Sequence, residues 1–174
     1  EEIDRRAMET RTVTVGFDPV SGFIGTKVAQ GKTLSCTNYD KLLILFKDGT
    51  YQVISIPEKH YLHQGGAQVA YFGIADKKTV LNTIYRDSKT HLVYGKRFII
   101  TQFILDKLYR YMEEGMDLHF LSPDPPPTLS LHFIPKTRQR QSSVRVIVQD
   151  IAVKNVSAKS VKLSSKPVKK IGFE

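Results

Sequence analysis

Residues 42–56 read LLILFKDGTYQVISI, and this stretch gives a strong β signal. A continuous apolar run, 42–46, ends at Lys47-Asp48-Gly49, and a second β-rich run, 51–56, follows it until Pro57. An Asp-Gly pair tolerates the positive φ that tight hairpin turns require. The stretch therefore predicts an antiparallel hairpin rather than a buried helix.

Other segments extend the β prediction to the rest of the chain. Apolar residues occupy every second position of 129–133, and the valines of 144–148 alternate in the same way. A period of two places one set of side chains inward and the other in solvent. The best helix candidate, 101–114, is rich in β-branched and aromatic residues with poor helical periodicity, so we expect strand and turn there, with at most a short helical piece. The predicted fold class is all-β.

The hairpin turn recurs along the sequence. Asp48, Asp87 and Asp124 each lie between β-rich runs, at spacings of 39 and 37 residues. Such a spacing suits a four-stranded blade, so 174 residues hold about three to four blades, in a closed or an open array. The third turn, 120–127, contains four prolines and is interpreted as a rigid loop tip rather than a peptide ligand.

Composition limits the partners and the compartment. A net charge of +9 and a pI of about 9.6 favour a polyanionic partner, which could be nucleic acid, an acidic membrane surface or an acidic protein. No apolar run approaches the roughly 18 residues that span a bilayer, and the charged start is unlike a signal peptide. A single cysteine, Cys36, suits a reducing compartment. We expect a cytoplasmic protein without a membrane partner, and the start without Met suits the C-terminal piece of a larger protein.

The predicted organisation has three parts. Residues 1–10 form a lead-in, 11–163 form the β domain, and 164–174 form a basic C-terminal tail. A final strand is expected within 160–163, and the lysine-rich residues beyond it are expected to be a loose end.

Residues with catalytic or metal-binding chemistry are sparse. His60 and His63 are three residues apart, but no third or fourth ligand accompanies them, so no metal site is expected. The chain has neither a Walker-type phosphate loop nor a serine-nucleophile motif. Cys36 lacks a neighbouring cation and is predicted to be a buried, inert thiol. No catalytic residue is predicted.

Five segments in order resemble one protein family. SGFIGT at 21–26, YRD at 85–87, VYGKRF at 93–98, DKLY at 106–109 and IAVK at 151–154 are similar to the C-terminal domain of the A subunit of bacterial type IIA topoisomerases, the topoisomerase IV and gyrase A family. The resemblance covers nearly the whole chain. It implies a β-pinwheel, in which neighbouring blades exchange strands and a basic outer rim binds and bends duplex DNA without reading its sequence.

The same resemblance implies a division of labour in the parent enzyme. This chain would be a non-catalytic DNA-binding domain without a cofactor, whereas the core that uses ATP and Mg²⁺ lies outside it. The parent would associate with the nucleoid and with a topoisomerase B subunit. Arg110-Tyr111 is similar to the arginine-tyrosine pair at the DNA-cleaving site of this enzyme class, but it lies in the pinwheel-like segment, so a packed tyrosine is expected.

Two departures from the family favour a shortened pinwheel of the topoisomerase IV type. The Gln-Arg-Arg-Gly-Gly-Lys-Gly box of gyrase is absent. Asn155, Ser160 and Val161 stand where the topoisomerase IV-like group tends to have Gly, Gly and Asn, which puts the close turns of that segment in question.

Eight cations are candidates for the DNA-binding rim. Two come from the family match, three are packed into 136–140 without an acidic residue, and three lie in the last part of the chain. They are Lys96, Arg97, Lys136, Arg138, Arg140, Lys154, Lys159 and Lys162. The alternative function is a β-propeller-like protein-interaction module, whose basic surface serves solubility or an acidic partner and whose Pro125–Pro127 loop serves docking.

Overall fold

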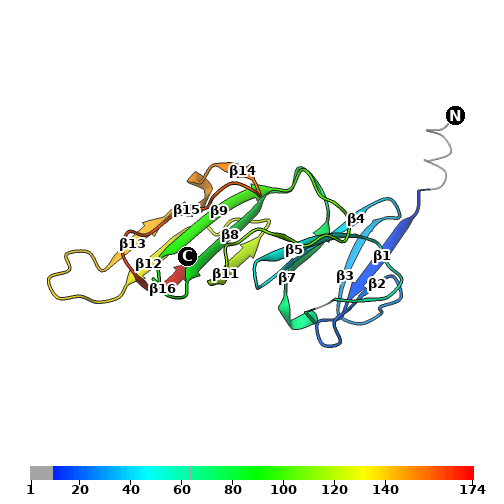
Figure 1. The fold of residues 1–174 in the computed structure, drawn as a ribbon, viewed down its shortest axis with the longest axis horizontal. Helices are drawn as coiled ribbons and strands as arrows, with labels where there is room; N and C mark the ends of the chain where they lie inside the picture. The colour runs from blue at the N-terminus through cyan, green and yellow to red at the C-terminus, as the bar shows by residue number, and fades with distance from the viewer. Residues whose placement is uncertain (1–9, 63) are drawn as a thin grey trace. The chain divides into compact units, whose positions relative to one another are not determined.

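The chain is all-β, as predicted. The computed structural model describes residues 10–62 and 64–174, which form strands β1–β16 and two short 3₁₀ turns, η1 and η2, with no α-helix among them (Figure 1). The strands make four sheets, none closed as a barrel, an arrangement consistent with a β-pinwheel-like domain. No helix of the described residues is long and apolar enough to cross a membrane.

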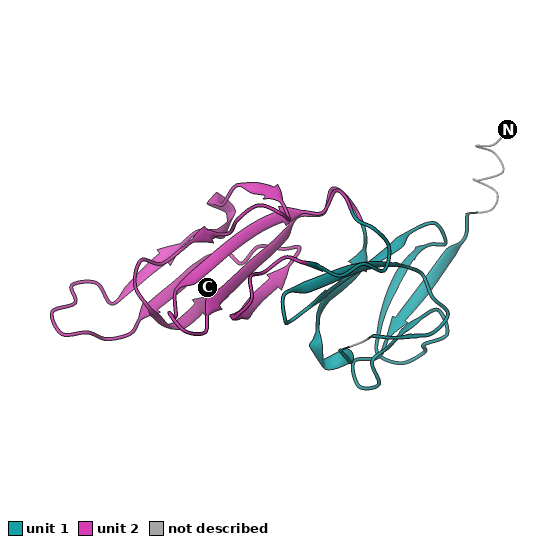
Figure 2. Cartoon of the chain, viewed as in Figure 1, with its two compact units in different colours: residues 1–75, 103–109 teal, residues 76–102, 110–174 magenta. Residues whose placement is uncertain are grey.

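Two compact units divide the chain (Figure 2). Unit 1 comprises residues 1–75 and 103–109, and unit 2 comprises 76–102 and 110–174. The chain therefore leaves unit 1, forms part of unit 2 and returns once. The expected domain of 11–163 is shared between the two units, and the expected lead-in of 1–10 lies outside the described residues except for Thr10.

Unit 1 contains two sheets that share one apolar core. Their strand orders are β3-β1-β2-β6 and β10-β5-β4-β7. Val15 and Phe17 from the first sheet pack into the same core as Leu42, Ile44 and Phe46 from the second. The elements are β1 Thr12–Phe17, β2 Phe23–Gly25, β3 Lys32–Thr37, β4 Lys41–Phe46, β5 Thr50–Ser55, β6 His60–Tyr61, η1 Gly66–Gln68, β7 Val69–Ile74 and, from the returning segment, β10 Tyr109–Arg110.

The hairpin predicted from residues 42–56 is confirmed. Strands β4 and β5 pair antiparallel, with Leu45 opposite Tyr51. Gly49 takes a φ of 96°, a conformation that costs an L-residue energy, and Asp48 Oδ1 accepts a hydrogen bond from the Thr50 amide at 3.0 Å. Since residues 42–46 are all buried, the continuous apolar run forms a strand covered on both faces.

Unit 2 also contains two sheets around one core. Their orders are β11-β8-β9-β14 and β13-β12-β16, and β15 additionally pairs with β9. β14 runs parallel to β9, whereas the other pairings are antiparallel. Ile84 and Val93 share a core with Leu129, Leu131 and Val168. The elements are β8 Leu81–Asp87, β9 Val93–Ile99, β11 Met116–Ser122, β12 Leu129–Phe133, β13 Ser143–Val146, η2 Val148–Asp150, β14 Val153–Asn155, β15 Val161–Lys162 and β16 Val168–Phe173.

The prediction of a recurring hairpin turn is confirmed at two positions and wrong at the third. The loop after Asp87 joins the antiparallel pair β8 and β9, as predicted. The proline-rich loop around Asp124 does not join a pair, because β11 pairs with β8 while β12 pairs with β13 and β16. This loop connects the two sheets of unit 2. The turn residues end a strand, but they do not specify which strand it pairs with. The helix candidate 101–114 contains turns and the two-residue strand β10.

The C-terminal end is part of the sheet, which corrects the prediction of a loose end. β16 pairs with β12, and the side chain of Val168 is fully buried in the core of unit 2. Arg86 Nη1 donates hydrogen bonds to the carbonyl oxygens of Val168 at 3.1 Å and Lys169 at 3.2 Å. Exposed lysines flank the buried valine, and their charge conceals the strand in the sequence. β15, Val161–Lys162, lies within the strand expected at 160–163.

Candidate nucleic-acid interface

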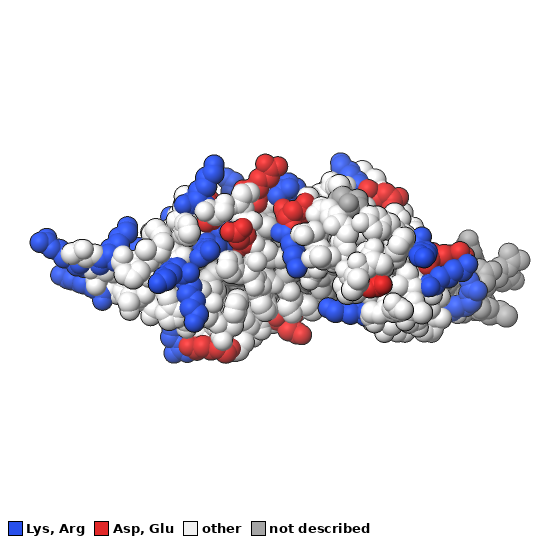
Figure 3. All heavy atoms as spheres, turned by 90° about the horizontal axis from the view of Figure 1, so that it is seen from below, with Lys and Arg blue, Asp and Glu red and all other residues white. Residues whose placement is uncertain are grey.

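Positive charge is distributed unequally between the two units. Unit 2 carries 17 Lys and Arg residues against eight Asp and Glu residues, whereas unit 1 carries nine of each. The whole formal charge of +9 therefore belongs to unit 2. Figure 3 shows basic side chains over the β12–β13 end of this unit, at the left, with no acidic side chain among them.

Three of the predicted rim cations lie together in the β12–β13 loop, residues 134–142. Lys136, Arg138 and Arg140 are exposed, and the loop contains no acidic residue. The loop has its own hydrogen bonds, because the Lys136 amide donates to Gln139 Oε1 at 3.1 Å and Gln139 Nε2 donates to the Gln141 carbonyl at 2.6 Å. Arg138 has a φ of 66°. A short internally bonded loop thus holds three cations in solvent.

Three further predicted cations are exposed beside β9. Lys154 belongs to β14, Lys159 follows the turn after β14, and Lys162 belongs to β15. Both of these strands pair along the same side of β9. The structure therefore places these three lysines on one sheet edge, separate from the β12–β13 loop.

Lys96 differs from the prediction of a rim cation. Only 7% of the residue is exposed, and its ammonium group donates hydrogen bonds to the carbonyl oxygens of Tyr111, at 3.1 Å, and Val156. Burial lowers the pKa of Lys96, and the nearby charge of Glu113 partly opposes that shift. The position beside a strand suggested exposure, but Lys96 lies within β9 and its side chain reaches carbonyl oxygens of residues 111 and 156. Lys96 is therefore not an exposed cation.

Arg97 is half-buried and has structural partners. Its Nε donates to Asn82 Oδ1 at 2.8 Å, and its Nη1 donates to the carbonyl oxygens of Gln149 at 2.9 Å and Ile151 at 3.2 Å. These bonds fix η2 and the residue after it against β9. The family-matched pair Lys96-Arg97 thus stabilises unit 2 from within, and the exposed cations are those of the loop and the sheet edge.

The outer face of the β13-β12-β16 sheet adds polar groups that sequence reasoning did not select. His132 lies between Ser143 of β13 and Lys170 of β16 in one cross-strand row. In another row Arg145 forms an ion pair of 2.7 Å with Glu174, next to Ser130. The alternation of β12 predicted that His132 faces solvent, but the pairing of β16 was needed to place Lys170 beside it.

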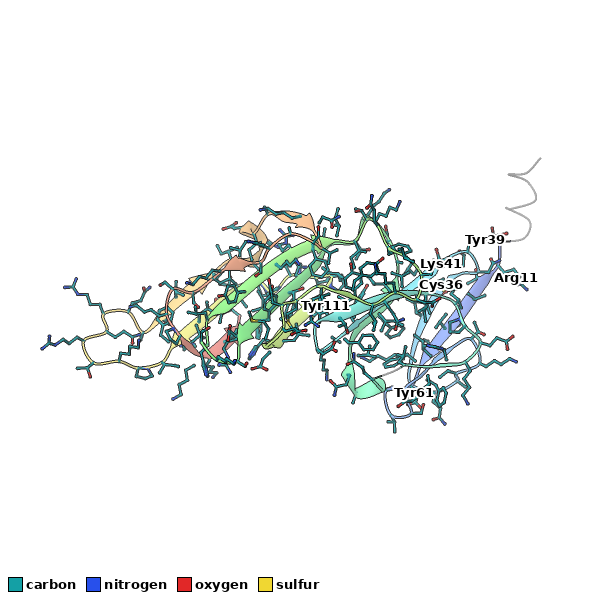
Figure 4. All side chains as sticks on the ribbon, viewed as in Figure 1. Arg11, Cys36, Tyr39, Lys41, Tyr61 and Tyr111 are labelled. Carbon is teal, nitrogen blue, oxygen red and sulfur yellow. The ribbon has the colours of Figure 1, made fainter. Side chains whose placement is uncertain are left out.

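The other candidate side chains lack a reactive arrangement. No cluster of three or more metal-ligating side chains occurs in residues 10–62 and 64–174, and His63 lies outside these ranges. Cys36 is buried, and desolvation raises its pKa, with a smaller contribution from Asp40. Tyr111 is 1% exposed and stacks on Phe98 with 6.0 Å between ring centroids. Figure 4 labels Cys36 and Tyr111 on their respective units.

An all-β chain that concentrates its positive charge on one unit belongs to the class of basic β domains. Comparison with known proteins identifies the family within this class. The chain belongs to the family described as topoisomerase C-terminal domain, Bacteroidota, whose match spans residues 14–174. The family resemblance of the ordered motifs is confirmed.

A curated relative and the solved structures complete the comparison. Over 170 residues the chain is 23% identical to the A subunit of DNA topoisomerase 4 from Borreliella burgdorferi. The alignment covers 97% of this chain but 26% of that relative, so the chain spans about a quarter of the relative's length. No solved structure matches the chain.

Proposed function

We propose that this chain is the DNA-binding domain from the A subunit of a topoisomerase, in which unit 2 makes the contact with duplex DNA. The observation that carries the proposal is the location of the entire +9 charge on unit 2. Family membership supports the topoisomerase context. Duplex DNA carries about one negative charge per 1.7 Å of its axis, so a cationic surface gains affinity by releasing condensed counterions.

The exposed cations favour contact with phosphates over readout of bases. The β12–β13 loop presents Lys136, Arg138 and Arg140, and the β9 edge presents Lys154, Lys159 and Lys162. Two separate groups of cations on one unit can contact separate stretches of backbone. Bending a site of 20–30 base pairs costs on the order of 1–6 kcal/mol, which additional phosphate contacts offset. We therefore propose binding that is largely independent of sequence and accompanied by bending.

The proposed parent enzyme supplies the chemistry. Its ATP-dependent strand-passage core, the Mg²⁺ ions, the DNA-cleaving site and the association with a B subunit belong to parts of the parent outside these residues. This domain holds a DNA segment for that core, and in the cell it is nucleoid-associated through the same contact.

A salt titration of DNA binding tests the proposal. Fluorescence anisotropy of a labelled duplex measures the affinity of the whole chain and of a variant in which Lys136, Arg138 and Arg140 are replaced by Gln. Each lost phosphate contact reduces the slope of log K against log [salt] by about 0.9, so three contacts reduce it by about 2.7. The matched control replaces Arg11, Lys32 and Lys47 of unit 1, which are also exposed.

The control separates a defined contact surface from bulk charge. We expect the unit 1 variant to retain nearly the full slope although it loses the same charge. Equal slopes for both variants would show that net charge alone drives binding. An absence of duplex binding at low salt would instead favour the alternative, a protein-interaction module with a basic surface. End-to-end energy transfer on a doubly labelled duplex tests bending in the same titration.

A further inference from the structure

A hollow of about 280 Å³ opens on unit 2 around Lys96. We name it the Lys96 pocket; its lining includes three cations, Lys96, Arg110 and Lys159, one carboxylate, Glu113, and the chain from Val156 to Ala158. It is smaller than the roughly 300–1,000 Å³ typical of sites for drug-sized molecules. Its size admits one small group together with a few water molecules.

The buried ammonium group of Lys96 is the main reason to expect an anion there. A lysine has three N–H donors, and the carbonyl oxygens of Tyr111 and Val156 take two of those of Lys96. Within the part of the chain that the structure describes, no carboxylate forms an ion pair with Lys96. Buried charges in proteins are normally paired, because an isolated ion loses its hydration without compensation. The ammonium group also lies 5.5 Å from the centroid of the Phe98 ring, a contact that uses none of its N–H donors. The third N–H donor is therefore the group that a ligand in the pocket would engage.

The other charged groups at the pocket also favour an anion. Lys159 is exposed and adds a second cation to the lining of the pocket. Arg110 also lines the pocket, but its guanidinium already has partners in the protein, among them the Met112 carbonyl, to which Nε donates at 3.1 Å. Glu113 is the only carboxylate in the lining, and its Oε1 accepts a hydrogen bond from Ser160 at 3.3 Å. Burial lowers the pKa of Lys96, so an anion beside the ammonium group would stabilise its charged form.

We propose that the Lys96 pocket binds a single phosphate group. Where that phosphate belongs to a DNA backbone, the proposal rests on the proposed function, and the pocket then holds one position of the duplex more tightly than the exposed lysines do. Where the phosphate belongs to a small molecule, the same donors bind it without DNA. Both sources present the same phosphate group to the pocket. They can be distinguished because DNA competes with inorganic phosphate for the pocket only if the DNA backbone is the ligand.

Inorganic phosphate is the probe that tests the pocket. It is titrated into the whole chain at constant ionic strength with chloride as the balancing anion, and the amide resonances of Ser157, Ala158 and Lys159 report occupancy. Lys159→Gln should weaken phosphate binding about tenfold, the size of one charge-assisted hydrogen bond. The control Lys77→Gln removes the same charge from an exposed position of unit 2 that lies outside the lining and outside the two proposed groups of DNA-binding cations, and it should change binding less than about twofold.

Replacing Glu113 tests the pocket through an increase in phosphate affinity rather than a decrease. Glu113→Gln removes the competing negative charge and should tighten phosphate binding about threefold or more, while its amide can still accept the Ser160 hydrogen bond. Glu114 is exposed, adjacent in sequence and outside the lining, so Glu114→Gln is the matched control and should have little effect. Both Gln replacements are surface changes that leave the core intact, so loss of folding does not obscure the result.

A duplex competition identifies the source of the phosphate. If DNA displaces inorganic phosphate from the pocket resonances, the backbone is the ligand. If phosphate binds as predicted and DNA leaves those resonances unchanged, the pocket takes a free or small-molecule phosphate. If Lys159→Gln binds phosphate as Lys77→Gln does, and Glu113→Gln as Glu114→Gln does, the pocket does not bind phosphate. DNA binding that persists in that case leaves the proposed function standing.

Discussion

Replacing Val168 with Ala tests whether the C-terminal segment is a structural strand. Val168 is fully buried in the unit 2 core, beside Leu129 and Leu131, and it pairs with Phe133 across β12 and β16. The replacement removes two methyl groups from this core and leaves the backbone bonds to Arg86 in place. A loose basic tail would tolerate the change without cost.

The expected loss follows from the burial. Each buried methylene-sized group contributes about 0.8 kcal/mol of transfer free energy, and the cavity left behind adds to it. Val168→Ala should therefore lower the free energy of unfolding of unit 2 by about 2 kcal/mol. Lys169 is exposed at the neighbouring position, so Lys169→Ala should change it by less than about 0.5 kcal/mol.

Urea denaturation followed by amide hydrogen exchange with mass spectrometry measures both variants. The exchange readout is needed because the chain has two compact units, and a single two-state transition cannot be assumed for it. Peptides from β12 and β16 should lose protection together in Val168→Ala, while peptides from β4 keep theirs. If the two variants have the same stability within about 0.5 kcal/mol, β16 does not contribute to the core and our account of the C-terminal end is wrong.

Three further predictions concern the hairpin turns and the thiol. Gly49→Ala should destabilise the β4–β5 hairpin by about 1–2 kcal/mol in a urea titration, because φ there is 96°; a neutral effect would contradict that turn. Hydrogen bonds from the Thr90 and Lys89 amides lower the pKa of Asp87, so the bonds that this carboxylate accepts stabilise the β8–β9 turn above about pH 4 and are lost as the pH falls through the lowered pKa. Once the intrinsic pH dependence of amide exchange is divided out, the protection of the amides in that turn should fall on acidification in the native chain and stay constant in Asp87→Ala. The thiol of Cys36 is buried and its pKa is raised, so a thiol reagent should modify it only as unit 1 opens in denaturant, and rapid labelling of the folded chain would show that it is accessible.

Local patterns predicted the strands well because their causes are local. The turn at Gly49 needs a residue that tolerates positive φ, and the sequence supplies it between two β-rich runs. Leu129, Leu131 and Phe133 are buried as their alternation predicts, and His132 between them is exposed. The family motifs were specific as an ordered set, and the family match from residue 14 to residue 174 agrees with them.

Burial of charge and choice of strand partner were not predictable in the same way. Lys96 is buried, and its ammonium group donates hydrogen bonds to the carbonyl oxygens of Tyr111 and Val156, which are distant in the sequence, so its burial could not be predicted from the local pattern. β16 is hidden in the sequence because exposed lysines follow Val168, so its average polarity suggests a tail. Asp124 marks a turn as expected, yet the flanking strands pair in different sheets.

Unit 2 is proposed to bind duplex DNA through its exposed cations. A titration of the isotope-labelled chain with a short duplex, followed through backbone amide resonances, tests it most directly. We predict that the largest shifts fall in residues 134–142 and 153–162 and that raised salt reverses them. Shifts concentrated in unit 1, or no shifts at low salt, would show that the exposed cations of unit 2 do not bind the duplex.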